Sequence, residues 1–286
     1  MSSILQNKID FIALVSVNHA NPNGDPLNGN RPRVNYSGFG EISDVCIKRK
    51  IRNRMQDMHK SIFVQSEERS DDGYESLSER ANAVMADVKG KEEYAKKACE
   101  TWIDVRSFGQ VFAFKTKKDS KEKDGISVGV RGPVSIHQAV SCSVIDVNSM
   151  QITKSVNSEP AEKKSSDTMG TKHMVLFGLY QIKGSINVQL AEKTGFTNED
   201  AELIKECLRT LFQNDASAAR PDGSMEVCKL YWWKHNCKDG QYSSAKVHHS
   251  LNITVKEGIN FPQSFDDYEI KLDNLEDLEP EIIDGI

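Results

Sequence analysis

The chain has 286 residues, enough for one large domain with insertions or for two smaller ones. Hydrophobic residues make up 38% of it and charged residues 28%, a composition that excludes collagen-like and wholly disordered proteins. No apolar run approaches the roughly 18 residues needed to cross a bilayer, and the first residues lack the apolar core of a signal peptide. We therefore expect a cytoplasmic protein with no membrane partner.

The net charge of −5 is unevenly distributed. Residues 264–286 hold nine acidic residues and one Lys, a net of −8, which leaves +3 for residues 1–263. Between Arg31 and Arg54, seven Lys or Arg stand against two acidic residues. A concentrated basic patch favours a polyanionic partner in spite of the acidic total.

The residues that usually carry metal or covalent chemistry form no recognisable motif. None of the six cysteines makes a C-x-x-C pair, which argues against a disulfide framework and a zinc ribbon and indicates reduced, mostly buried thiols. The seven histidines make no H-x-x-x-H, and there is no G-x-S-x-G and no phosphate-binding glycine loop. We expect no metal, no cofactor and no catalytic residue. A metal-independent ribonuclease with His19 or His137 as general base stays open as an alternative.

The first predicted elements are a strand, a long loop and a helix. Residues 10–17 are almost continuously apolar, which predicts a central strand. Residues 18–40 contain four Gly and three Pro without apolar periodicity, and loops of this length are usually functional. Ser43 can cap a helix with one apolar stripe, formed by Ile47, Ile51, Met55, Met58 and Ile62.

The basic side chains of this loop and helix form the strongest candidate binding surface. On the helix, Arg49 and Arg52 are expected to project away from the apolar stripe, with Lys48 at its flank. Arg31 and Arg33 flank a proline, which places both on a stiff backbone beside exposed main-chain N–H groups. This surface suits phosphates, and the alternative is an ordinary solvated basic face. Replacing the three helix residues with Ala should weaken RNA binding with little change in stability.

The middle of the chain is expected to contain a helical insertion, strands and a projecting hairpin. Residues 66–100 are polar and fit a mostly helical insertion, while residues 102–114 and 126–147 read as strands around a charged turn at 115–125. In the strand expected at residues 102–114, four aromatic residues occupy even-numbered positions and would share one face, which favours core packing over base stacking. They are Trp102, Phe108, Phe112 and Phe114. Residues 148–172 form a polar excursion between strands and predict a protruding hairpin.

The last elements complete a recognisable order. Thr197 and Asp200 fit a capping box ahead of an apolar helical face, and residues 225–234 read as a strand. The resulting order β-α-β-β-α-β predicts an α+β protein with the ferredoxin-like arrangement that RNA-recognition modules also use.

Several motifs, in order along the chain, resemble the backbone subunit of type I CRISPR surveillance complexes (Cascade), with the type I-C version closest. The resemblance runs from about residue 8 to Trp233, and the agreement of several motifs is far more specific than any one of them. The motifs are residues 18–25 (NHANPNGD), 30–33 (NRPR), 104–112 (DVRSFGQVF), 131–134 (RGPV), 168–173 (TMGTKH) and 215–223 (DASAARPDG).

The resemblance implies a non-catalytic subunit whose copies polymerise along CRISPR RNA, with target DNA and other Cascade subunits as further partners. It implies an RNA-recognition-like palm (1–65 and 101–263), a helical insertion (66–100) and a thumb hairpin (about 148–172) that folds over RNA held by a neighbouring copy. An acidic tail (264–286) lies outside the resemblance. The residues expected to bind RNA are Asn18, His19, Asn21, Asn23, Arg31, Arg33, Lys48, Arg49, Arg52, Arg131, Met169, Lys172 and His173.

Two other functions remain possible on the sequence alone. One is a metal-independent endoribonuclease of the same RNA-recognition-like superfamily, and the other is an acidic protein-interaction scaffold without an RNA role. Within the first function, Met169 is an apolar residue flanked by polar ones near the expected hairpin tip, and we expect it to wedge against a kinked RNA base step.

Overall fold

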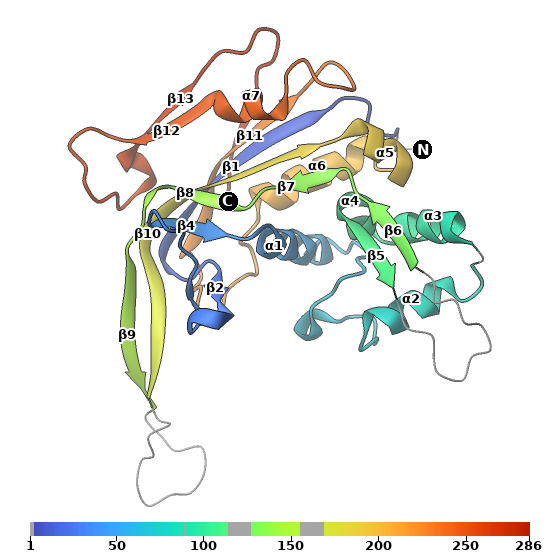
Figure 1. Cartoon of the computed structure of the whole chain (residues 1–286), viewed down its shortest axis with the longest axis horizontal. Coiled ribbons are helices and arrows are strands. Elements are labelled where there is room, and N and C mark those ends of the chain that lie inside the picture. The colour runs from blue at the N-terminus through green and yellow to red at the C-terminus, as the bar shows by residue number, and fades with distance from the viewer. Residues whose placement is uncertain (1–2, 89, 114–126, 155–168) are drawn as a thin grey trace, which may run out of the picture.

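A computed structural model describes residues 3–88, 90–113, 127–154 and 169–286. Its centre is an antiparallel sheet in the order β14-β11-β1-β10-β8-β4, in which β7 and β9 also pair with β10. Figure 1 shows this sheet in the upper half of the molecule, with a long hairpin below it. The strands are β1 (Ile9–Ala20), β4 (Phe39–Ile42), β7 (Val134–Ile136), β8 (Ala139–Val144), β9 (Val147–Thr153), β10 (Met169–Ile186), β11 (Met225–Lys234) and β14 (Glu281–Asp284).

Strand β1 is buried on both faces, as its continuous apolar sequence predicted. Phe11, Ala13 and Val15 point into a core shared with helices α1 (Asp44–Asp57), α5 (Val188–Thr194) and α6 (Asn198–Arg209). Ile12 and Leu14 point into a second core on the other face of the sheet, beneath α7 (Ser244–His249) and the strand pair β12 (Leu251–Val255) and β13 (Tyr268–Leu272). The alternation of side chains along a strand produces this division into two cores.

Local sequence signals predicted the starts of the two principal helices correctly, but the apolar stripe expected on the first was too long, because α1 ends at Asp57, before Met58 and Ile62. Ser43 caps α1, its Oγ accepting from the Cys46 N–H at 3.3 Å, and Ile47, Ile51 and Met55 are buried. Helix α6 begins with the predicted capping box, in which the Asp200 N–H donates to Thr197 Oγ1 and the Thr197 N–H donates to the Asp200 carboxylate. The Ser43 cap and the capping box each satisfy N–H groups that the first helical turn leaves without a partner.

The segment expected to be a helical insertion, residues 66–100, shares its packing with the residues that follow it. Together they contain α2 (Leu77–Met85), α3 (Lys91–Thr101), α4 (Ile103–Phe108), and the pair β5 (Gly109–Ala113) and β6 (Ser127–Arg131), with a short 3₁₀ turn at Glu67–Arg69. A separate hydrophobic core joins these elements and extends from Phe63 to Val128. The helices expected at residues 66–100 are therefore present, but the packing unit continues into the segment expected to be a strand.

The prediction of one strand over residues 102–114 is wrong in its first half, which forms α4. Trp102, the residue just before α4, and Val105 on α4 reach the same core, and the chain turns at Gly109, where φ is +81°. A Cβ at Gly109 would lie 2.4 Å from the Val130 carbonyl oxygen, so only glycine fits this turn. Tertiary packing overrides the strand propensity of this sequence.

Core packing of the aromatic residues is confirmed where the structure describes them. Trp102 and Phe112 are buried, with Phe63 between them at ring-centroid distances of 4.7 and 5.0 Å. Phe108 is only partly buried and packs on the main core. Phe114 and the charged turn at 115–125 lie outside the described residues.

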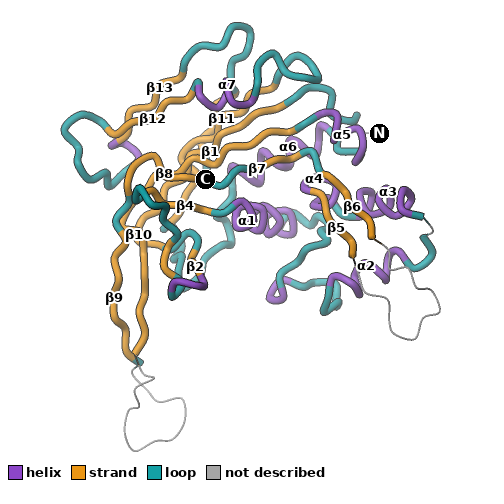
Figure 2. The backbone as a smooth tube through the Cα atoms, viewed as in Figure 1, coloured by secondary structure: helices purple, strands orange, loops and turns teal. Residues whose placement is uncertain are grey.

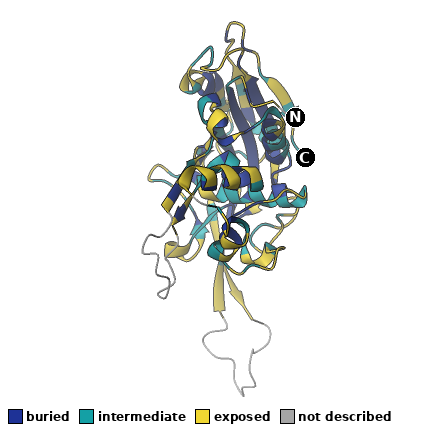
Figure 3. Cartoon of the chain, turned by 90° about the vertical axis from the view of Figure 1, so that its right-hand side faces the viewer, coloured by how far each residue is buried: buried dark blue, intermediate teal, exposed yellow. Residues whose placement is uncertain are grey.

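A projecting hairpin is present where the sequence predicted one. Strands β9 and β10 pair from Val147–Val175 to Thr153–Met169, and the segment between them lies outside the described residues. Figure 3 shows the projecting part of the hairpin as largely exposed and extending away from the buried sheet. The predicted strand after residue 173 is the continuation of β10, which runs to Ile186 and pairs with β1 along its length.

The acidic C-terminal segment is part of the fold and not a free tail. Strand β13 pairs with β12, and β14 pairs with β11 at the edge of the main sheet. Tyr268, Leu275 and Leu278 are buried in the second core. Acidic residues lie between these apolar ones in the sequence. The prediction of an acidic tail rested on the charge of the segment and is wrong, because the segment covers the second core.

A buried polar cluster ties this covering layer to the sheet. Asp10 on β1 accepts from His235 Nε2 at 2.8 Å and lies 3.1 Å from Lys8 Nζ. His248 on α7 donates from Nε2 to the Gly184 carbonyl at 3.0 Å and lies 4.0 Å from Asp10. Burial lowers the pKa of His248, an effect that the Gly184 carbonyl and Asp10 only partly offset and that nearby His137 and Lys183 reinforce.

We expect this cluster to make the fold sensitive to mild acid. The unfolded chain binds a proton at His248 near pH 6.5, whereas the folded chain binds it only at lower pH, so stability falls as pH drops below about 6.5. The fall continues until the folded pKa is passed. Urea unfolding at a series of pH values should show a shallower decline between pH 7 and 5 for His248→Gln, which retains a donor. An identical decline in both proteins would contradict this assignment.

Candidate nucleic-acid interface

The loop after β1 and the hairpin lie against each other. Within residues 18–40 the chain forms the small pair β2 (Gly24–Asp25) and β3 (Arg31–Pro32), joined by a 3₁₀ turn at Pro26–Asn28, and β3 packs on β10. Arg31 Nη1 donates to Ser149 Oγ at 2.7 Å, and the same hydroxyl is 2.8 Å from His173 Nδ1. Figure 2 shows the loop beside the root of the hairpin. Three candidate polar segments, far apart in sequence, thus share one surface.

The two faces of the hairpin carry different side chains. Met169 and His173 face the loop together with Ser149 and Gln151, whose Nε2 lies 3.0 Å from the Met169 sulfur. Lys172 is opposite Met150, so both belong to the other face. The sequence analysis grouped Lys172 with Met169 and His173 as RNA-binding residues. The pleat of the strand puts Lys172 on the opposite face from the other two.

Two of the candidate asparagines hold the loop in shape. Asn21 is buried, and its Nδ2 donates to the Asn30 carbonyl at 2.6 Å. Asn23 Oδ1 accepts from the Ser43 N–H at 2.9 Å, which fixes the loop to the start of α1. Arg33 lies 3.6 Å from Asp25, with more than a third of its side chain exposed. Arg31 and Arg33 therefore remain accessible on a loop that the asparagines brace.

The basic residues of α1 are less free than the sequence predicted. Lys48 Nζ is 2.9 Å from Asp44, one turn earlier on the helix. Arg49 Nη1 donates to the Val64 carbonyl at 2.7 Å, and burial lowers the pKa of its guanidinium, helped by the like charge of Arg52. Lys48 retains the clearest access to a ligand among the three candidate helix cations.

The prediction that Arg52 projects into solvent is wrong. Its Nε donates to Asp104 Oδ2 at 2.8 Å, its guanidinium lies 5.1 Å from the Phe108 ring centroid, and only 12% of its side chain is exposed. Asp104 is fully buried and also accepts from the N–H groups of Phe63 and Val64. Arg52 therefore joins α1 to the insertion, and we now expect its replacement to lower stability.

One cluster of charges was missed by the sequence reading. Lys50 and Arg220 both pair with Asp215, the latter at 3.1 Å from Nε, which leaves two cations on one carboxylate. The Asn21 N–H donates to the Ala219 carbonyl, so this cluster adjoins the loop. Burial lowers the pKa of Lys50, and Asp215 opposes that effect. The signal was weak because Lys50 occurs on the apolar side of α1, where a cation is not expected.

Arg131 and the two candidate catalytic histidines lie apart from one another. Arg131 ends β6, which packs against α3, α4 and α5, away from the hairpin (Figure 1). His19 follows Asn18, which is paired with Phe177, whereas the His137 N–H donates to the Lys183 carbonyl. Phe177 and Lys183 are six residues apart on β10, a separation on the order of 20 Å along the strand. The structure therefore does not join His19 and His137 as an acid and base pair.

The described residues contain no group of three or more His, Cys, Asp or Glu that could hold a metal ion. All six cysteines are free thiols, of which Cys99 and Cys207 are buried and Cys237 is exposed. Within the same described ranges, no helix has the length and apolar character to cross a membrane.

Comparisons with known proteins agree with this architecture. A family model described as CRISPR-associated protein Cas7 matches residues 7–273. A Haloferax volcanii protein, described as CRISPR-associated protein Cas7, is 25% identical over 228 residues, which cover 75% of this chain and 67% of that protein.

Two solved structures share 16% identity with the chain. One, described as "CRISPR RNA-guided surveillance complex, pre-nicking", has a TM-score of 0.50 and covers 89% of this chain and 84% of its own. The other, described as "CRISPR RNA-guided surveillance complex", has a TM-score of 0.47 and covers 88% and 78%. The former likeness shows a shared α+β fold built on a large antiparallel sheet.

The fold thus defines a mixed α+β protein of the kind seen in a CRISPR surveillance complex. The family match spans nearly the whole sequence, and the chain belongs to the Cas7 family of CRISPR-associated proteins.

Proposed function

We propose that the chain is a non-catalytic CRISPR-RNA-binding subunit whose copies assemble along the guide RNA in a type I complex that resembles the type I-C form. The observation that carries this proposal is the chain of hydrogen bonds Arg31–Ser149–His173, which joins the basic loop to a projecting hairpin. Membership of the Cas7 family supports it. The partners are CRISPR RNA, target DNA, further copies of the chain and other Cascade subunits.

The proposed palm is ferredoxin-like. The core strand order β11-β1-β10-β8, with α1 and α6 packed on one face, supports this arrangement. In this division, residues 1–65 and 101–263 form the palm, 66–100 the insertion and about 148–172 the thumb. The insertion core and the C-terminal strands cross these boundaries, so the functional units share packing.

The proposed RNA path follows the loop and the loop-facing side of the hairpin. Arg31 and Arg33 bind phosphates, Lys48 on α1 supplies a further cation, and Asn21 and Asn23 keep the loop in position. On the hairpin, His173 contacts the RNA and Met169, 61% exposed, wedges against a kinked base step. The remaining candidates, Asn18, His19, Arg49, Arg52, Arg131 and Lys172, support the path or contact RNA in a neighbouring copy.

Replacing Arg31 and Arg33 together with Ala should lower the salt dependence of RNA binding. Each lost phosphate contact reduces the logarithmic slope by about 0.7 for a single strand, so the double variant should lose roughly 1.4. Affinity measured at several salt concentrations gives this slope. The matched control is the pair Lys96 and Lys97 on α3, both exposed, replaced with Ala. Equal slopes in the two double variants would contradict the proposed path.

Deleting residues 155–166 should impair assembly and leave the monomer folded. The strands on either side are held by their own pairing, which runs from Val147–Val175 to Thr153–Met169. Negative-stain images and sedimentation with a long CRISPR RNA should show shorter or irregular assemblies, whereas thermal unfolding should match the parent. Met169→Ser should reproduce part of the effect. Full-length ordered filaments from the deletion variant would contradict the role of the hairpin.

The endoribonuclease alternative is tested with the same material. Labelled CRISPR repeat RNA incubated with the purified chain should be bound and protected without discrete products. Cleavage that disappears in His19→Ala or His137→Ala would overturn the non-catalytic assignment.

A further inference from the structure

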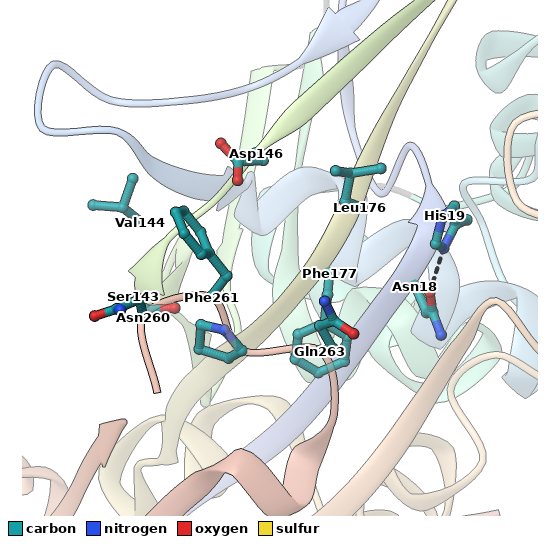
Figure 4. Close-up of a pocket in the computed structure, with 11 residues that line it drawn as sticks. Asn18, His19, Ser143, Val144, Asp146, Leu176, Phe177, Asn260, Phe261 and Gln263 are labelled. Carbon is teal, nitrogen blue, oxygen red and sulfur yellow. Dashed lines mark hydrogen bonds between the residues drawn. The ribbon is translucent and has the colours of Figure 1, made fainter. Parts of the chain in front are cut away.

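A cavity of about 360 Å³ opens at the root of the hairpin, outside the hydrogen-bonded surface of Arg31 and His173. Four segments meet there: the end of β1, the turn between β8 and β9, the middle of β10, and the C-terminal loop at 260–263. Figure 4 shows Phe261 on one side and His19 on the other, with Phe177 and Gln263 between them. The cavity is large enough for one planar ring system with room for its edge groups.

The aromatic side of this cavity is unusually exposed. Phe261 is 73% exposed, and no described side chain stacks on it. Leu176 and Val144, also in the lining, are exposed at 38% and 59%. An aromatic ring left in water above a hollow is a platform on which another flat ring can stack, and nucleic-acid bases use such platforms regardless of sequence.

The polar side of the cavity suits the edge of a base and not a phosphate. The lining contains no Lys or Arg, and its one acidic residue, Asp146, is exposed with no ion pair or side-chain hydrogen bond in the described part of the chain. The side-chain amides of Asn260 and Gln263 are likewise without protein partners there. Amides offer a donor and an acceptor each, whereas a carboxylate only accepts.

The backbone at the mouth of the cavity connects it to the basic loop. His19 has φ of +51°, uncommon for a residue with a side chain, and its Nδ1 lies 2.5 Å from Asn18 Oδ1. His19 lies within the last part of β1, which ends at Ala20, and the loop that carries Arg31 follows directly. A strand held by its phosphates on the loop can therefore place a neighbouring base in the cavity.

We propose that this cavity binds one unstacked base of a single-stranded nucleic acid, stacked on Phe261 and read at its edge by Asp146. A carboxylate prefers adjacent donors, so guanine, with N1–H and N2–H side by side, fits best and uracil fits worst. The inference rests on the proposed RNA-binding function and adds a base-reading site to its phosphate contacts. Guide RNA and target DNA both present this chemistry.

The experiment uses the full chain carrying Phe261→Trp. All three natural tryptophans are buried, so the introduced indole is the accessible one and its fluorescence reports stacking. Titration with a short oligouridine containing one central guanine should quench this fluorescence more strongly than oligouridine alone. The same comparison with oligothymidine containing one guanine shows whether the base belongs to RNA or to DNA.

Two further variants separate stacking from edge recognition. Phe261→Ala should weaken binding of the guanine-containing strand by roughly 5- to 150-fold, the range found for loss of one stacked base. Asp146→Asn should keep binding and lose the preference for guanine over uracil. Val111→Ala, which shortens another exposed apolar side chain on β5, is the control and should change neither.

Each of the other outcomes contradicts either the base site or the proposed RNA-binding function. If Phe261→Ala binds as tightly as the parent and the indole is not quenched, the base site is wrong while RNA binding stands. If the parent binds no RNA at any salt concentration, the proposed function fails first. If the indole fluorescence is quenched when the protein concentration is raised without nucleic acid, the cavity holds a side chain of a second copy. The base assignment is then overturned.

Discussion

Replacing Arg52 with Ala should lower the free energy of unfolding by about 3 kcal/mol, because it leaves a buried carboxylate without its cation. Asp104 is fully buried and fixes the N–H groups of Phe63 and Val64, so it cannot move to water to compensate. The change also removes the contact of the guanidinium with the Phe108 ring. The loss should weaken the connection between α1 and the insertion.

Urea unfolding of Arg52→Ala beside Lys48→Ala gives the cleanest comparison. Lys48 pairs with a partly exposed Asp44 one turn away, so its removal should change stability by less than about 0.5 kcal/mol. Both variants lose one positive charge from the same helix. If they unfold at the same urea concentration as the parent, the Arg52–Asp104 pair is not a structural brace. If only Arg52→Ala is destabilised, its effect on RNA binding must be measured at a temperature where it is folded.

Patterns within one element were read correctly from the sequence. These patterns are the apolar stripe of α1 as far as Met55, its Ser43 cap, the capping box of α6 and the unbroken apolar run of β1, and each arises from residues a few positions apart. Their physical cause is local, because helix periodicity and N-terminal caps require only neighbouring residues. The hairpin was also visible, since two strands bracket a polar segment.

Features decided by distant contacts were missed. Helix α4 forms where aromatic and β-branched residues favour a strand, and it packs Val105 into the insertion core beside Trp102, the residue that precedes the helix. Arg52 looked solvent-exposed because no sequence pattern places Asp104, 52 residues away, beside it. The binding surface differs in this respect, because Lys172 and His173 lie on opposite faces through the pleat of β10 alone, a separation that the alternation of a strand predicts from the sequence.

The C-terminal segment carries the largest expected effect. Truncating the chain after Gln263 should prevent stable folding, because it uncovers the second core and removes β14 from the sheet edge. Within that segment, Leu278 is 3% exposed and Leu275 is 8% exposed. Each substitution of a buried Leu by Ala costs about 2 to 5 kcal/mol, and a domain has only about 5 to 15 kcal/mol of net stability.

Leu278→Ala is the measurable form of this prediction, with an expected loss of about 3 kcal/mol in urea unfolding. The control is Glu276→Gln combined with Glu279→Gln, which removes two exposed negative charges from the same stretch and buries nothing. If packing holds this segment in place, Leu278→Ala is destabilised and the charge variant is not. If the segment were instead an acidic tail that contributes only charge, Leu278→Ala would unfold with the parent and the truncated chain would remain folded.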